Sequence, residues 1–161
     1  ILIAREVPES GGDTLFIDMT RAFATLSEDL KRTLRGLRAR HVLPQRQKQI
    51  FKEGSIYEGT REEAVHPVVI RHPENGREVL YVNPHYTRHF EGWTEEESLG
   101  LLHTLYRHAQ RPEFSCRFRW RKDSIALWDN RQTWHFAVND YGAKPRVMHR
   151  LMIMGSALHA A

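Results

Sequence analysis

The sequence predicts a mainly β protein with a few helices, arranged as a β-sandwich or jelly roll. Three observations predict this class. Short strand-like segments recur along the chain, apolar and basic residues alternate over 114–121, and a single long helix is indicated. With 161 residues and 40% hydrophobic content, the chain can bury one core. A single domain over residues 1–161 is therefore the simplest organisation.

Capping residues indicate two helices. Ser27 can cap a short helix that runs to about residue 34, where Gly36 ends it. Thr94 and Glu97 form a capping box, so we expect a longer helix to begin there and to run to about Gln110.

Strand-like segments account for most of the remaining chain. We expect a hairpin where β-branched residues flank Asn75-Gly76, because that dipeptide favours a tight turn. The alternation in 114–121 places Cys116 on the apolar side, where a buried thiol is expected. The polar, glycine-containing segment 45–63 is expected to be a long loop or lid. Further strands are expected over 1–4, 15–18, 37–42, 124–130 and 146–154.

The charge of the chain leaves two classes of partner open. A net charge of +4 and an isoelectric point near 9.5 suit an anionic small molecule or nucleic acid. Arg117, Arg119 and Arg121 form a basic stripe that could contact phosphates in a binding module. No ladder of aromatic residues accompanies the stripe, so a solvated outer face is favoured and nucleic acid is not expected.

Composition also bears on location and assembly. The single cysteine excludes an internal disulfide and fits a reducing, cytoplasmic setting. No apolar run approaches the roughly 20 residues of a membrane span, so a membrane partner is not expected. Homo-oligomerisation stays open.

Among the ten histidines, two patterns invite a metal interpretation. His72-Pro73-Glu74 has the spacing of a chelate, but Pro73 and Glu74 are turn formers, so we interpret this segment as a turn. His135 is different, because Arg146 and Arg150 follow it on an otherwise apolar strand. Alternation places both arginines on one face, about 13 Å apart. A guanidinium keeps its charge, so each needs an anionic partner, unless the pair forms internal salt bridges or a solvated edge.

Four segments, in order, resemble the taurine/α-ketoglutarate dioxygenase family: PESGGDTLFIDM, HPVVIRHPENGREVLYVN, IALWDNRQTWH and RVMHRLMIMG. The resemblance implies a double-stranded β-helix (jelly-roll) core. It also implies an enzyme that uses Fe(II), 2-oxoglutarate and O2 to hydroxylate a small anionic substrate. That substrate would be a sulfonate such as taurine, an alkyl sulfate or a carboxylate.

The resemblance also assigns residues. His135 matches the second histidine of the iron triad, and Thr14 and Arg146 match the residues that hold the distal carboxylate of 2-oxoglutarate. Arg150 matches an arginine that holds the anionic group of the substrate, and Tyr86 falls where an aromatic residue lies against it.

The family's upstream His-x-Asp, which supplies the other two iron ligands, does not occur in residues 1–161. We therefore expect a catalytic domain that is incomplete at its N-terminus. The alternative is a catalytically inactive, truncated β-sandwich or a module that binds anions or nucleic acid.

Overall fold

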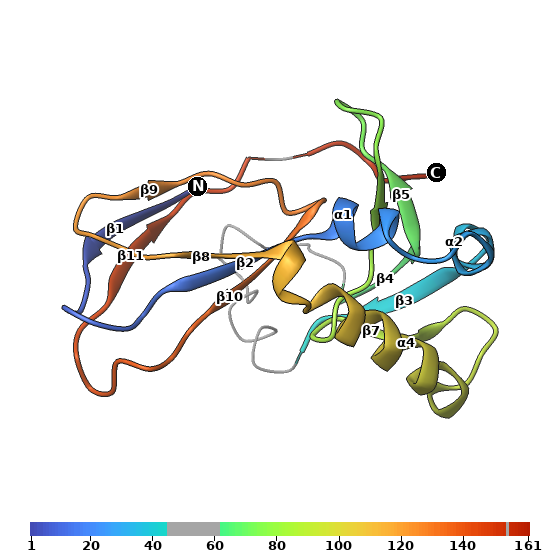
Figure 1. Cartoon of the computed structure of the whole chain (residues 1–161), viewed down its shortest axis with the longest axis horizontal. Helices are drawn as coiled ribbons and strands as arrows, with labels where there is room; N and C mark the ends of the chain where they lie inside the picture. Colours follow the sequence, from blue (N-terminus) through green and yellow to red (C-terminus); the bar gives the residue numbers. More distant parts are fainter. Residues whose placement is uncertain (45–61, 154) are drawn as a thin grey trace.

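The structure is a computed structural model that describes residues 1–44, 62–153 and 155–161. At one end of the molecule, two three-stranded antiparallel sheets pack on each other (Figure 1). Their shared core holds Ala4 and Met148 from one sheet and Phe16 and Phe118 from the other. The first sheet has the order β11 (Val147–Arg150), β1 (Leu2–Glu6), β9 (Ile125–Ala126), and the second β10 (Thr133–Ala137), β2 (Thr14–Asp18), β8 (Ser115–Phe118).

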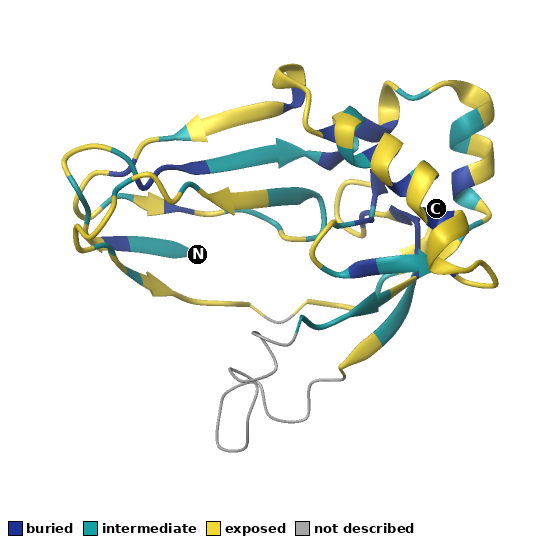
Figure 2. Cartoon of the chain, turned by 90° about the horizontal axis from the view of Figure 1, so that it is seen from below, coloured by how far each residue is buried: buried dark blue, intermediate teal, exposed yellow. Residues whose placement is uncertain are grey.

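The other end of the molecule carries the helices and two further three-stranded sheets (Figure 1). The larger hydrophobic core lies here, and Figure 2 shows buried segments gathered where helices meet strands. The sheets have the orders β12 (His159–Ala160), β5 (Val69–Arg71), β6 (Glu78–Leu80) and β4 (Glu63–Pro67), β3 (Arg38–Val42), β7 (Thr87–Phe90). The helices are α1 (Met19–Ala24), α2 (Glu28–Arg35), α4 (Glu95–Ala109) and the short 3-10 helix η1 (Pro112–Phe114).

The expected mainly β fold with a few helices is confirmed. β5 and β6 pair as an antiparallel hairpin, with Gly76 in its turn at φ +70°. α4 begins with the expected capping box, in which the Thr94 hydroxyl accepts from the Glu97 N–H and the Glu97 carboxylate accepts from the Thr94 N–H. No helix in the described part of the chain is long and apolar enough to cross a membrane.

Some expectations were wrong in detail. Cys116 is exposed, and it lies on β8, the edge strand of its sheet. Ser27 precedes α2 but makes no capping hydrogen bond with its side chain. The strand expected over 146–154 is shorter, since β11 ends at Arg150.

α1 was not predicted; Asp18 caps it through the N–H groups of Thr20 and Arg21. Residues 45–61 of the expected loop or lid lie outside the described residues.

Candidate functional site

His135 lies in β10, where its backbone pairs with Phe16 of β2. The Trp128 ring lies 4.9 Å from the imidazole and the Phe16 ring 6.5 Å away, centroid to centroid. Partial burial and the positive charge of Arg150 lower the pKa of His135, although the residue as a whole stays exposed. The neutral imidazole is the form that binds metal ions.

Thr14 lies on the same face of this sheet as His135, because Thr14 pairs with Ala137 and Phe16 pairs with His135. The Thr14 side chain is buried at 2% exposure. Its hydroxyl oxygen accepts a hydrogen bond from the Trp120 indole N–H at 3.0 Å. A hydroxyl can donate as well as accept, so the Thr14 proton is left for a second partner.

Arg146 reaches the loop that leads to Thr14. Its Nε donates to the Gly12 carbonyl oxygen at 2.9 Å, while its buried Nη2 has no partner among the described residues. Gly12 has φ +70°, and a Cβ there would lie 3.1 Å from Arg146 Cδ. The absence of a side chain at Gly12 thus lets the guanidinium pass close to the loop. A buried guanidinium arm is costly unless an anion or another acceptor pairs with it.

Arg150 and Tyr86 approach His135 from other elements. Arg150 is exposed at the end of β11, pairs with Leu2 of β1, and donates from Nη2 to the Met152 sulfur at 3.2 Å. Its positive charge contributes, after burial, to the lowered pKa of His135. Tyr86 is half-buried and lines a cavity of about 610 Å³ that His135 also lines.

The structure links the expected site residues indirectly. Arg146 bonds to Gly12, two residues before Thr14, and the charge of Arg150 lowers the pKa of His135. His135 and Tyr86 line one cavity. Thr14, Arg146 and Arg150 are not part of the cavity lining.

The cavity wall contains residues that sequence reasoning missed. His41 and His66 lie 5.2 Å apart, ring to ring, and each lies 5.7 Å from Tyr81. Burial, with a smaller contribution from His66, lowers the pKa of His41 to about 4, so this imidazole is neutral at pH 7. They come from β3, β4 and the segment after β6, so no local spacing signals the cluster.

The basic stripe is partly neutralised within the protein. Arg117 Nε donates to Asp13 at 2.6 Å, and Nη2 lies 3.4 Å from Asp140. β8 ends at Phe118, so the three arginines do not share one strand face. This arrangement does not favour the alternative of a phosphate-binding module.

Metal-ligating side chains gather at a different place. Over the described ranges, one group of three or more such side chains lies within reach of a common ion: His72, Glu74 and Asp129. His135 is not part of it. A metal ion at His135 would need ligands from outside the described residues.

The fold and the site together define a jelly-roll protein with a neutral histidine and two arginines around one end of its sandwich. The chain belongs to the taurine catabolism dioxygenase TauD, TfdA family, whose model matches residues 1–152.

Individual relatives agree with the family assignment. The chain is 34% identical to an alkylsulfatase of Acinetobacter baylyi over 96% of its length, which spans 51% of that relative. It is 32% identical to an alpha-ketoglutarate-dependent sulfate ester dioxygenase of Pseudomonas putida, covering 96% of this chain and 54% of the relative. A crystal structure of a taurine dioxygenase from Burkholderia xenovorans matches with a TM-score of 0.77 and 36% identity, covering 91% of this chain and 48% of that one. The chain thus spans about half the length of these relatives.

Proposed function

We propose that this protein acts as an Fe(II)- and 2-oxoglutarate-dependent dioxygenase that hydroxylates a small organic anion. Family membership supports the reaction class. The observation that carries the proposal is the pair formed by Arg146 and Thr14. One guanidinium arm of Arg146 is buried without a partner among the described residues, and the Thr14 hydroxyl has a proton to donate. This donor set suits the distal carboxylate of 2-oxoglutarate, because charge-assisted bonds from a guanidinium to a carboxylate are strong.

His135 would be one protein ligand of the iron, through a neutral imidazole. A facial arrangement of two histidines and a carboxylate requires two further ligands, which would come from outside the described residues. Bound iron would supply the oxygen chemistry. The residues described here would hold 2-oxoglutarate, orient the substrate and limit the access of water.

The substrate would be an organic anion. Named relatives act on sulfate esters and on taurine, and those substrates carry a sulfur oxyanion. Arg150 supports the same class here, because its exposed cation lies near His135 and is not neutralised by an ion pair among the described residues. Tyr86 would contact the uncharged part of the substrate from the cavity wall. A cytoplasmic location stays a prediction, which cell fractionation can check.

The test uses the intact protein, with Fe(II)-dependent succinate release from 2-oxoglutarate as the measurement. His135→Ala should abolish turnover, because two remaining ligands hold the metal poorly. His149→Ala is the matched control: His149 is also an exposed strand histidine, its side chain points to the opposite face of β11 from that of Arg150, and its Nδ1 accepts from Arg5 on β1. Full turnover by His135→Ala would contradict the proposal.

The same assay separates the two arginines. Losing a paired charge in such a site costs about 2–5 kcal/mol of binding. Arg146→Ala should therefore raise the 2-oxoglutarate requirement at least tens-fold. Arg150→Ala should weaken the organic substrate and leave uncoupled 2-oxoglutarate turnover largely intact. Identical kinetic defects in both variants would refute this division.

A further inference from the structure

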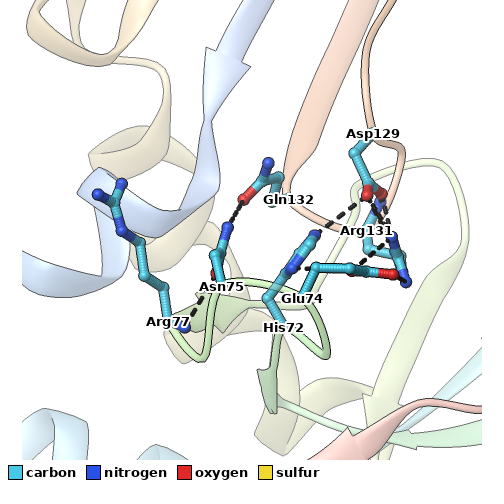
Figure 3. Close-up of polar contacts among 7 residues, drawn as sticks. All are labelled: His72, Glu74, Asn75, Arg77, Asp129, Arg131 and Gln132. Atoms are coloured by element: carbon cyan, nitrogen blue, oxygen red, sulfur yellow. Dashed lines mark hydrogen bonds and ion pairs between the residues drawn. The ribbon is translucent and has the colours of Figure 1, made fainter.

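Four polar side chains join the β5–β6 turn to the segment that precedes β10 (Figure 3). His72, with 4% exposure, has Nε2 at 3.0 Å from Asp129 Oδ2 and Nδ1 at 3.2 Å from Glu74 Oε2. Arg131 Nε donates to Asp129 Oδ1 at 2.9 Å, and its Nη2 lies 2.9 Å from Glu74 Oε2. Two carboxylates thus face one guanidinium and one imidazole.

The composition of this cluster favours a closed network of hydrogen bonds and ion pairs over a metal site. His72, Glu74 and Asp129 offer ligand atoms within 4.8 Å of one another. Arg131, however, already pairs with both carboxylates, and its hydrogen bonds hold the pKa of Asp129 well below its usual range. A metal dication would have to displace or repel this guanidinium.

The β5–β6 turn is the firmly held side of the network. The His72 N–H donates to the Arg77 carbonyl oxygen at 2.8 Å, and the Gly76 N–H donates to the His72 carbonyl oxygen at 2.8 Å. The Asn75 side chain adds a 3.2 Å hydrogen bond to Gln132 (Figure 3). The turn can therefore act as an anchor for residues 128–132.

Residues 128–132 are the side that matters for the candidate site. Trp128 contacts the His135 ring, and its indole N–H donates to the Asn130 side chain at 2.8 Å. Asn130 and Arg131 line the cavity, and His135 follows four residues after Arg131. Any shift of this segment moves the ring against His135 and the wall of the cavity together.

We propose that His72, Glu74, Asp129 and Arg131 form a positioning network that fixes residues 128–132 and, through them, the orientation of His135. The role in metal binding rests on the proposed function, whereas the orientation of the ring does not. Partners around a metal-ligating histidine set its orientation, and their loss typically weakens metal binding about 10- to 100-fold.

Asp129→Asn and His72→Gln test the network in the intact protein. The control is Glu78→Gln, which breaks the pair of hydrogen bonds from Arg35 at 2.6 and 2.8 Å. That ion pair joins α2 to β6, in the same sheet as the anchoring turn, and within the described chain it shares no hydrogen bond or ion pair with residues 128–132. Co(II) binding followed by visible absorbance replaces turnover as the readout, with thermal unfolding measured alongside. The network variants should raise the half-saturating Co(II) concentration by about tenfold. Glu78→Gln should lose stability with Co(II) affinity unchanged.

The double variant shows whether the two residues act through one contact. If they do, His72→Gln with Asp129→Asn should weaken Co(II) binding no more than the stronger single variant. Arg131→Lys keeps the charge without the planar fork and should fall between wild type and Asp129→Asn.

Three results would overturn the inference: unchanged Co(II) affinity in both network variants, an equal loss in Glu78→Gln, or a second bound Co(II) that His72→Gln removes. The last would make the cluster a metal site. If wild-type protein binds no Co(II), the proposed function fails instead. The imidazole NMR signals of His135 then decide the inference, because they should move in Asp129→Asn and stay in place in Glu78→Gln.

Discussion

Gly12→Ala is a small change that should disturb Arg146 without removing any polar group. At φ +70° an alanine adopts the left-handed region, which costs about 1–2 kcal/mol of folding free energy. The new Cβ would also lie 3.1 Å from Arg146 Cδ and 3.2 Å from its Nε, inside the ordinary contact distance of about 3.5–4.0 Å. The arginine must therefore move by a few tenths of an ångström, away from the Gly12 carbonyl oxygen that it binds.

Gly142→Ala separates the two effects. Gly142 has φ +61° and nothing within 4 Å of a Cβ, so alanine there carries the backbone strain without crowding. Urea unfolding of the intact protein should show a similar loss of about 1–2 kcal/mol in both variants. Weakening a hydrogen bond to a charged group by about 1 kcal/mol corresponds to roughly a fivefold change in affinity. Gly12→Ala alone should therefore raise the half-saturating 2-oxoglutarate concentration about fivefold. Equal 2-oxoglutarate requirements in the two variants would refute the reasoning.

Two further predictions concern buried polar groups. Thr14→Val leaves the buried Trp120 indole N–H without its acceptor, so urea unfolding should show a loss of about 1–3 kcal/mol that Thr14→Ser does not show; equal stability of the two variants would contradict this. His41 has a folded-state pKa of about 4, below its ordinary value of 6.5, so its contribution to stability is complete above pH 6.5 and is lost as the pH falls toward 4. His41→Gln should flatten the pH dependence of the unfolding free energy across that window, and an unchanged slope would count against a buried neutral imidazole.

Local signals explain why much of the fold could be predicted from the sequence. The hairpin turn at Gly76 and the capping box of Thr94 and Glu97 each depend on residues within four positions of one another. These neighbouring residues are sufficient to predict the turn and the start of the helix without knowledge of the rest of the fold. Burial on an edge strand is different, because it depends on what covers the strand. The alternation around Cys116 predicted a strand, which is confirmed, but the burial that it predicted for the Cys116 thiol was wrong.

In the candidate site, too, local features could be predicted from the sequence and long-range contacts could not. The resemblance pointed to Thr14, His135 and Arg146, and alternation along a strand pointed to the arginines. The network at His72 escaped notice because its partner Asp129 lies 57 residues away, and the turn-forming character of Pro73 and Glu74 already explained the motif. Long-range pairs of this kind form because the hairpin packs against residues 128–132. The spacing of residues in the sequence does not reveal such packing.

The environments of the two arginines give their separation a physical basis. Alternation predicted that Arg146 and Arg150 share one face of a strand that begins at Arg146. Arg146 is instead half-buried just before β11, with one arm on the Gly12 carbonyl oxygen and one buried arm that has no partner among the described residues; our proposal places an anion at that arm. Arg150 is exposed and contacts a thioether, so its charge acts over a wider range of positions. A buried fork suits a co-substrate of constant shape, and an exposed cation tolerates anions of different size. Relatives that act on different sulfur oxyanions while sharing alpha-ketoglutarate dependence are consistent with this arrangement.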